Sequence, residues 1–202
     1  MPEGPLLGRA EPRPDMKTVA DCIAQRRELF TGITCERQVE RAVEATVRSF
    51  KAGGRVLLFG NGGSAAQAQH IAAEFSGRFM LERPAWAGLA LTTDTSALTA
   101  IANDYGYDQV FARQLRAHGR AGDVAIGLTT SGESANIIHA FRAARELKIT
   151  TVAFTGNGGG SIVGLSDIAI VGPSGPSWMV QEVHLALGHI MCELVELAMT
   201  RS

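Results

Sequence analysis

Short, unbroken runs of apolar residues divide the chain from residue 56 onward. Five such runs are present, at Val56–Phe59, Leu89–Leu91, Val124–Leu128, Thr151–Phe154 and Ile168–Val171. Unbroken apolar runs of this length are typical of β-strands that are covered on both faces, as in a parallel sheet. The pattern therefore predicts five buried strands.

Helical periodicity fills most of the spaces between these runs. The predicted helices cover Ala65–Phe75, Val110–Ala117, Ala135–Leu147 and a long segment from about Ser177 to Met199. Strands that alternate with helices favour a parallel sheet joined by right-handed crossovers. We therefore predict an α/β fold with an open, doubly wound parallel five-stranded sheet and flavodoxin-like layering.

The segment before the first strand has a different pattern. Apolar residues recur at helical spacing from Met16 to about Phe50, and Gly32 and Thr34 divide this stretch into two helices. The first fifteen residues contain four prolines and are expected to form a flexible lead. The predicted organisation is a lead over 1–15 and a single domain over 16–202, with helices over 16–52 and an α/β core over 53–202.

Composition excludes several classes of protein. The net charge of −1 over 202 residues gives no broad attraction to nucleic acid or to membranes. The three cysteines are odd in number and lack C-x-x-C spacing, which disfavours a disulfide framework and fits a reducing compartment. We read no apolar run that approaches the roughly 18 residues of a membrane span. A cytoplasmic protein without a nucleic-acid or membrane partner is expected.

A glycine loop follows the first predicted strand. Gly60-Asn61-Gly62-Gly63-Ser64 leads into a helix and formally satisfies a dinucleotide fingerprint, but Asp94 lies 34 residues beyond Gly60, well past the usual ~20. No lysine follows the glycines, so a Walker loop is disfavoured as well. Two interpretations remain, a backbone site for an anion at the helix N-terminus or a turn that only permits tight packing.

A cluster of hydroxyl groups follows the third predicted strand. It consists of Thr129, Thr130, Ser131 and Ser134. Ser134 by itself could be only a helix N-cap, which would leave the other three hydroxyls unexplained. Four hydroxyls at a helix entry can surround a phosphate without any lysine, and the cluster therefore favours a phosphate site.

Six ordered motifs resemble the SIS (sugar isomerase) domain, and within it the sedoheptulose 7-phosphate isomerases, also called phosphoheptose isomerases. They are GNGGSA followed by QHIAAEFSGRF, then AIANDYGY, TTSGESAN, FTGNGGG and VQEVHLALGH. The resemblance extends from about Ala20 to Met199. It implies a homotetramer with active sites at subunit interfaces. It also implies conversion of sedoheptulose 7-phosphate to D-glycero-D-manno-heptose 7-phosphate, a step of heptose biosynthesis.

The same resemblance implies roles for individual residues. The zinc ligands of the family, one ion per subunit, match His70, Glu74, Gln181 and His189. The hydroxyls that bind the substrate phosphate match Thr129, Thr130, Ser131 and Ser134. The remaining substrate contacts match Asn61, Gly62, Gly63, Ser64, Asn103, Asp104 and Gln181. Trp178 departs from the family, which often has a small hydroxyl or acidic residue there, so the length and stereochemistry of the substrate stay open.

The chemistry of these residues suits a ketose–aldose isomerisation through an enediol. That reaction needs a base, an acid and stabilisation of the oxygen that gains charge. Glu74 is a reasonable base and His189 a reasonable acid, and the i,i+4 spacing places His70 beside Glu74 on one helix face. Glutamine is an uncommon zinc ligand, so the chemistry alone leaves metal binding open.

Alternatives accompany these assignments. His118, His139 and His184 are expected to be solvated or held in ordinary polar contacts, and Asp104 could only cap a helix that begins near Tyr107. The alternative function is a non-catalytic, tetrameric SIS-domain scaffold of the kind that associates with the bacterial replication initiator. Such relatives replace the second histidine of the last helix, whereas His189 is present here.

Overall fold

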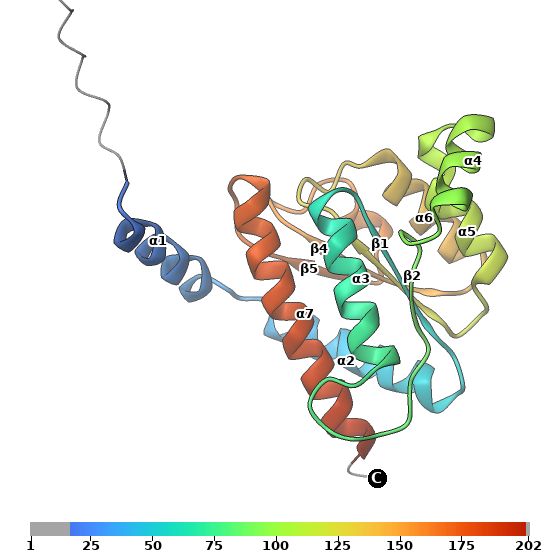
Figure 1. The fold of residues 1–202 in the computed structure, drawn as a ribbon, viewed down its shortest axis with the longest axis horizontal. Coiled ribbons are helices and arrows are strands. Elements are labelled where there is room, and N and C mark those ends of the chain that lie inside the picture. The colour runs from blue at the N-terminus through green and yellow to red at the C-terminus, as the bar shows by residue number, and fades with distance from the viewer. Residues whose placement is uncertain (1–16, 201–202) are drawn as a thin grey trace, which may run out of the picture.

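The sheet has five strands, all parallel, in the order β2-β1-β3-β4-β5. The computed structural model describes residues 17–200, so the predicted lead over 1–15 lies outside the described residues. The strands are β1 (Val56–Gly60), β2 (Gly88–Ala90), β3 (Val124–Leu128), β4 (Thr150–Thr155) and β5 (Ile168–Val171). The predicted parallel sheet is confirmed (Figure 1). The strand order reverses between β1 and β3, which is where ligands bind in open sheets of this kind.

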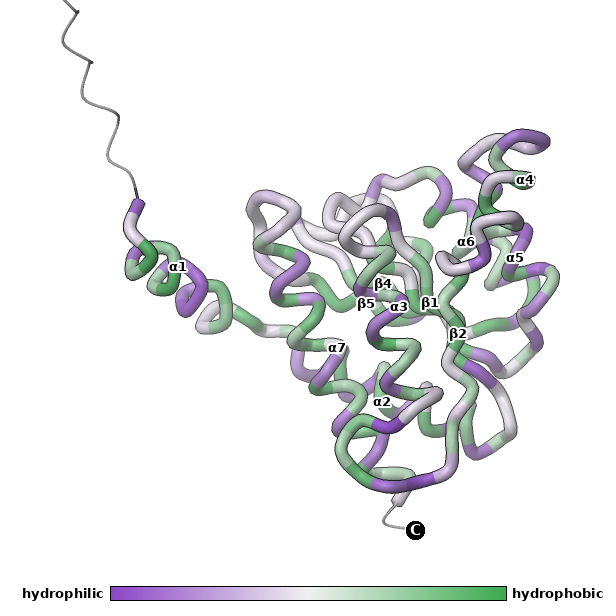
Figure 2. Tube along the Cα trace, viewed as in Figure 1, coloured by the Kyte–Doolittle hydropathy of each residue, from purple (hydrophilic) through white to green (hydrophobic). Residues whose placement is uncertain are grey.

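Helices cover both faces of the sheet. The first face carries α2 (Glu36–Lys51), α3 (Gly63–Ser76) and α7 (Ser177–Thr200), and the second carries α5 (Val110–His118) and α6 (Ala135–Glu146). Side chains alternate along each strand, so that Leu58 packs into the first core and Leu57 into the second. In Figure 2 the strands at the centre are coloured mainly as hydrophobic, as expected for a doubly wound fold.

The two N-terminal helices lie in different environments. The helix α1 (Val19–Thr31) begins with a capping box formed by Thr18 and Asp21, and none of its residues is buried. It projects away from the rest of the protein (Figure 1). By contrast, α2 contributes buried residues to the first core. The predicted break at Gly32 and Thr34 is confirmed, and of the two helices only α2 packs into the core.

The hydrophobic pattern did not predict one of the helices. The helix α4 (Thr95–Tyr105) has no buried residue, because its apolar side chains only partly pack on the second core. Asp94 caps it by accepting a 2.9 Å hydrogen bond from the backbone nitrogen of Ala97. Asp104 lies inside this helix, and Gly106 precedes the short 3-10 helix η1 (Tyr107–Gln109), so the suggested cap at Asp104 is wrong. A second 3-10 turn, η2, covers Val163–Leu165.

The last helix, α7, is the one described helix that is long and apolar enough to cross a membrane. Its apolar residues do not form one unbroken run, because polar residues such as Gln181, Glu182 and His184 interrupt them. However, α7 packs against α2 and α3, and its buried residues belong to the first core. The composition of α7 is therefore that of a core helix.

Candidate active site

The loops after β1 and β3 begin side by side at the point where the strand order reverses. Gly60 and Leu128, the last residues of these strands, are register partners. The two loops and the first turn of α7 enclose a cavity of about 300 Å³. It is lined by Asn61, Gly62, Gly63, Ser64, Leu128, Thr129, Thr130, Ser134, Ser177 and Gln181. The topology thus brings together the two loops that the sequence singled out separately.

The glycine loop needs its glycines for close approach. Gly62 occupies the N-cap position of α3 with a φ of 55°, a region that side chains rarely adopt. A Cβ atom on Gly63 would lie 2.7 Å from the side-chain amide of Gln181. The absence of a side chain at Gly63 therefore leaves room for the Gln181 side chain in the cavity. The N-terminus of α3 faces the same cavity.

The hydroxyl groups after β3 point toward one another and toward α7. The hydroxyls of Thr129 and Ser134 lie 3.3 Å apart, and Thr130 lies 3.1 Å from Ser177. Ser134 occupies the N-cap position of α6, but its side chain makes no capping hydrogen bond. The interpretation of Ser134 as only a cap is therefore wrong. Ser131 is exposed, and its hydroxyl accepts a 3.2 Å hydrogen bond from the backbone nitrogen of Glu133.

A neighbouring loop braces this hydroxyl cluster. The Glu133 carboxylate accepts hydrogen bonds from the backbone nitrogen of Ser161 at 2.6 Å and from its hydroxyl at 2.8 and 3.0 Å. These bonds hold the pKa of Glu133 below its usual value. Gly132 has a φ of 72°, and the Gly159 carbonyl occupies the space that a Cβ would need. The hydroxyl loop is thus fixed from behind by the segment that follows β4.

Side-chain hydrogen bonds hold Asn61, which lines the cavity. Asn61 and Asn136 exchange side-chain hydrogen bonds of 3.0 and 2.9 Å, and the Tyr107 hydroxyl donates to Asn61 at 3.1 Å. Asn136, Tyr107 and Ser177 were not predicted from the sequence, although Asn136 ends the TTSGESAN motif. Asn103 and Asp104 are exposed on α4, hydrogen-bonded to each other at 2.8 Å, and do not line the cavity.

Two histidines and a glutamate converge beside this cavity. The His70 Nε2 atom lies 3.3 Å from a Glu74 carboxylate oxygen and 2.8 Å from the His189 Nε2 atom. All three possible ligand atoms lie within 4.8 Å of one another. His70 thus faces α7, which carries His189, and Glu74 lies on the same side of α3.

Gln181, the fourth predicted ligand, contacts the glycine loop. Its amide nitrogen is 3.4 Å from the Ser64 hydroxyl, and it lines the hydroxyl cavity. Since eight residues separate Gln181 from His189, the two backbone positions are about 12 Å apart along α7. The structure therefore brings three of the four predicted metal ligands together and places the fourth with the predicted phosphate loop.

Comparisons with known proteins agree with this architecture. The SIS domain family matches residues 23–156 of the chain. The chain is 46% identical over 180 residues to a phosphoheptose isomerase of Rhodospirillum rubrum, covering 89% of this chain and 93% of that protein. It is 50% identical over 176 residues to the phosphoheptose isomerase of Paramagnetospirillum magneticum, covering 86% and 92%. The chain belongs to the phosphoheptose isomerase family of SIS domains.

A solved structure shows the same fold. The phosphoheptose isomerase from Neisseria gonorrhoeae superposes with a TM-score of 0.83 at 42% identity, covering 88% of this chain and 96% of that one. More distant SIS structures include the sugar isomerase domain of a transcription factor from Sphaerobacter thermophilus, with a TM-score of 0.55 at 20% identity. At that identity the likeness concerns the fold alone.

The remaining histidines of this family member lie outside the cluster. His184 is fully buried in α7, and its Nε2–H donates a 3.0 Å hydrogen bond to the Thr155 carbonyl. Burial lowers the pKa of His184 to about 4 despite that bond. His139 lies 2.8 Å from Gln109, and His118 is exposed. The expectation that these three histidines serve ordinary polar contacts or solvent is met, with His184 unexpectedly deep in the core.

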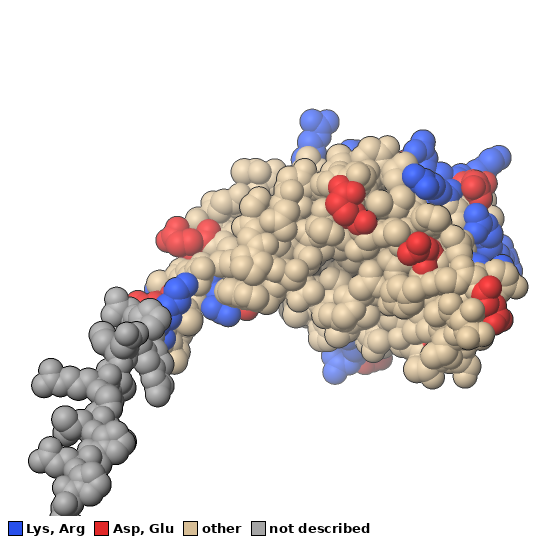
Figure 3. Space-filling view, turned by 90° about the horizontal axis from the view of Figure 1, so that it is seen from above, with Lys and Arg blue, Asp and Glu red and all other residues tan. Residues whose placement is uncertain are grey.

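The face that carries the strand ends has few charges. Seen from above in Figure 3, it is mainly uncharged, and most Lys and Arg side chains lie at its periphery. Among the described residues, no Lys or Arg lines the hydroxyl cavity. A phosphate bound there would depend on hydroxyls, backbone N–H groups and the helix termini.

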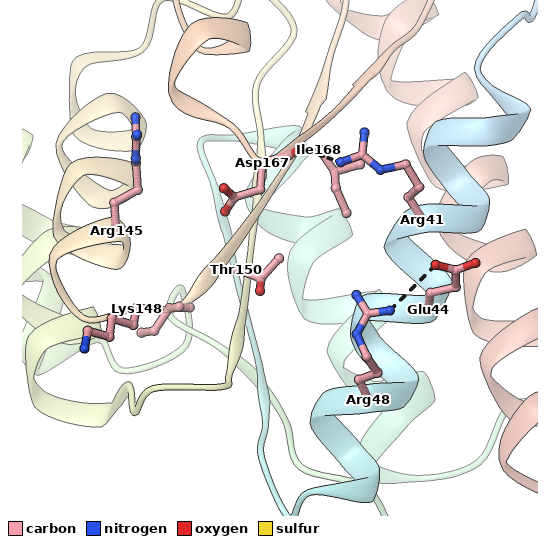
Figure 4. A pocket seen from close by; sticks show the side chains of 9 residues that line it. Arg41, Glu44, Arg48, Arg145, Lys148, Thr150, Asp167 and Ile168 are labelled. Atoms are coloured by element: carbon pink, nitrogen blue, oxygen red, sulfur yellow. Dashed lines mark hydrogen bonds and ion pairs between the residues drawn. The ribbon is translucent and has the colours of Figure 1, made fainter.

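A larger cavity of about 430 Å³ lies at the opposite, amino ends of β4 and β5. Its cations are divided between α2, which bears Arg41 and Arg48, and the end of α6, which bears Arg145 and precedes Lys148. Arg48 pairs with Glu44 at 3.6 Å, and in Figure 4 the Lys148 ammonium points away from the other labelled residues. We assign the site to the smaller cavity, because it lies at the carboxyl ends of parallel strands, where the hydroxyl groups converge.

Proposed function

We propose that this chain is a sugar-phosphate isomerase that converts sedoheptulose 7-phosphate to D-glycero-D-manno-heptose 7-phosphate in heptose biosynthesis. The observation that carries the proposal is the convergence of Glu74 with His70 and His189 beside a hydroxyl-lined cavity. Membership of the phosphoheptose isomerase family supports it. The cavity suits a phosphate group, and the carboxylate and imidazoles suit proton transfer.

The separation of the two subsites supports a substrate of this length. Ser64 lines the hydroxyl cavity and His70 belongs to the cluster, so the two positions are about 9 Å apart along α3. An extended seven-carbon chain has six carbon–carbon bonds of ~1.5 Å and spans a similar distance. A phosphate held by Thr129, Thr130, Ser131 and Ser134 would therefore leave the first two carbons near Glu74 and His189.

In the proposed mechanism, the Glu74 carboxylate removes a proton from C1 of the ketose. The electron pair forms the C1–C2 double bond, and the carbonyl oxygen on C2 accepts a proton from the His189 imidazole to give an enediol. Glu74 then returns its proton to C2 while the C1 hydroxyl gives its proton back to His189, which produces the aldose. We assign sugar contacts to Asn61, Gly62, Gly63, Ser64, Asn103, Asp104 and Gln181, among which Asn103 and Asp104 lie outside the cavity as the structure describes it.

We infer that the His–Glu–His cluster holds one zinc ion per subunit. Two imidazole nitrogens and a carboxylate oxygen within 4.8 Å of one another fit the donor set of a catalytic zinc site with an open position. When bound, such an ion supplies Lewis-acid polarisation of the substrate carbonyl. Gln181 would join it as a ligand only after its side chain leaves Ser64.

We further propose a cytoplasmic homotetramer with active sites at subunit interfaces, in which residues 16–202 form a single SIS domain. The support comes from an apolar groove of about 390 Å³ between α2, α7 and the end of α1, lined in part by Phe30, Ile190 and Leu194. These side chains are large, hydrophobic and 38 to 45% exposed in one chain. Ile190 follows His189 directly, so burial of this groove by another subunit would bring the interface next to the cluster.

Incubation of the purified protein with sedoheptulose 7-phosphate in D₂O, followed by NMR, tests the proposal. We expect the aldose signal to appear and solvent deuterium to enter at the exchanged carbon. A tetrameric protein that produces neither signal would instead support the scaffold alternative. The presence of His189 within hydrogen-bonding distance of His70 favours the enzyme.

A further inference from the structure

A buried ion pair joins the segment between α3 and β2 to α7. The Arg83 Nε atom lies 3.1 Å from the Glu196 carboxylate, and each side chain is only 2% exposed. The Arg83 guanidinium also stacks on Trp86 at 3.7 Å from the ring centre. A buried ion pair is weak evidence for a gain in folding stability, because the cost of desolvating the two charges offsets most of their Coulombic attraction. A role in fixing local geometry is therefore worth testing.

Arg83 binds the backbone at the position of the proposed base. Its Nη2 atom donates a 2.6 Å hydrogen bond to the carbonyl oxygen of Glu74. Its Nη1 atom donates to the carbonyl oxygens of Phe75 and Gly77 at 2.9 and 3.1 Å. These carbonyls belong to the last turn of α3 or follow it, where helical partners are missing. The guanidinium thus fixes the turn that carries Glu74.

Glu196 binds the backbone of the segment that follows α3. Its carboxylate accepts hydrogen bonds from the backbone nitrogens of Phe79, Met80 and Leu81 at 3.2, 2.8 and 2.9 Å. Burial raises the pKa of Glu196, but these three bonds and Arg83 outweigh it and hold that pKa below the usual value. The carboxylate therefore stays ionised in neutral solution.

The segment that Glu196 binds also contacts His189, the proposed acid. The ring of Phe79, whose backbone Glu196 binds, packs against the His189 ring with centroids 5.8 Å apart. Glu196 and His189 are seven residues apart on α7, which places them within about 20° on the same helix face. The same carboxylate therefore fixes the segment that contacts His189 and the guanidinium that holds Glu74.

We propose that Arg83 and Glu196 are positioning residues that set the relative placement of Glu74 and His189 across α3 and α7. The inference rests on the proposed isomerase function, because it assigns those two side chains to proton transfer. Displacement of a catalytic group by about 1 Å can cost on the order of 10² in rate. Loss of this pair should therefore impair turnover more than substrate binding, since Arg83 and Glu196 do not line the hydroxyl cavity.

The tests are Arg83→Lys, which keeps the charge but loses the forked hydrogen bonds, and Glu196→Gln, which keeps the shape but loses the charge. We expect each to lower kcat about ten- to a hundred-fold with KM for sedoheptulose 7-phosphate within about three-fold of wild type. Arg116→Lys, which alters the exposed 3.0 Å pair with Glu146, is the matched control and should leave both constants unchanged.

A second readout does not depend on turnover. We expect Co²⁺ to bind the variants about ten-fold more weakly than wild type and with an altered visible spectrum, because the ligand geometry is disturbed. Variants that are less stable but retain wild-type kcat per folded molecule and the wild-type Co²⁺ spectrum would show a merely structural pair and overturn the proposal. If Arg83→Lys does not fold, the near-isosteric Glu196→Gln decides by the same criteria. If wild type leaves the sugar unchanged, the proposed function fails, and Co²⁺ binding alone decides the positioning role.

Discussion

At the scale of single residues, Glu74 and His189 can be tested by changes that preserve their shape. We expect Glu74→Gln and His189→Asn each to lower kcat by roughly 10²–10⁴, the usual loss for a general base or acid. The fold should persist, because the His70–Glu74–His189 cluster is partly exposed rather than part of either core. Steady-state kinetics and circular dichroism check this expectation.

The controls for these substitutions come from exposed residues of the same types. Glu44→Gln alters a surface ion pair and His118→Asn an exposed imidazole, and both should retain activity. If the zinc proposal is correct, Glu74→Gln and His189→Asn should also lose metal by elemental analysis of the purified proteins. Near-wild-type turnover in either variant would remove that residue from the catalytic assignment.

His184 gives a second residue-scale prediction, on stability and pH. Its pKa is about 4 in the folded protein against 6.5 when unperturbed. As the pH falls, His184 is therefore protonated in the unfolded chain before it is protonated in the folded protein. Its contribution to the free energy of unfolding is full above about pH 6.5 and is lost as the pH falls toward 4. The shift corresponds to roughly 3 kcal/mol of unfolding free energy. Urea unfolding between pH 4 and 7 measures it.

The difference between two variants isolates the His184 contribution from those of other titrating groups. His184→Gln can still donate to the Thr155 carbonyl but cannot titrate, so it should show a shallower loss of stability below pH 6.5 than wild type. His118→Gln, at an exposed position, should follow the wild-type curve. Parallel curves for wild type and His184→Gln would contradict the assigned pKa.

At the scale of elements, the loop after β3 can be tested through its hydroxyls. Ser134→Ala should raise KM for sedoheptulose 7-phosphate by several-fold to ten-fold, because a typical hydrogen bond contributes about 1 kcal/mol. Unphosphorylated sedoheptulose should be a poor substrate for wild type and variant alike. Ser166→Ala removes a hydroxyl that bonds to the Ile162 carbonyl, outside the cavity, and should change neither value. Equal efficiency of the two sugars with wild type would remove the phosphate role of this loop.

At the scale of the whole molecule, the apolar groove beside α7 predicts assembly. We expect a tetramer by light scattering, and Leu194→Glu should dissociate it and abolish activity, since a charge would replace an apolar side chain in the buried groove. Val163→Glu is the matched control, because Val163 is 39% exposed against 38% for Leu194 and lies outside the groove. A fully active monomer at assay concentration would contradict this expectation.

The sequence by itself determined the sheet and most of its helices. Unbroken apolar runs marked all five strands, because the central strands β1, β3 and β4 are buried along almost their whole length, and the edge strands β2 and β5 remain apolar although they are partly exposed. The helix α4 was not predicted, because its one weak apolar stripe packs only at the edge of the second core. Its hydrophobic pattern is therefore weak. The sequence also predicted the glycine loop, the hydroxyl cluster and the His70–Glu74 pair, because each of them consists of residues close together in the chain.

Only the tertiary structure decided which distant residues meet. The alignment of α3 with α7 placed His189 at His70 and Gln181 at Ser64, so that these two residues of one helix contact different turns of the other. The Arg83–Glu196 pair joins residues 113 positions apart, and neither stood out from its sequence neighbours. Burial also set the pKa of His184 apart from that of a surface histidine. Spacing along a helix fixes the face on which a residue lies, but the packing of one helix on another fixes its partner and its exposure to water.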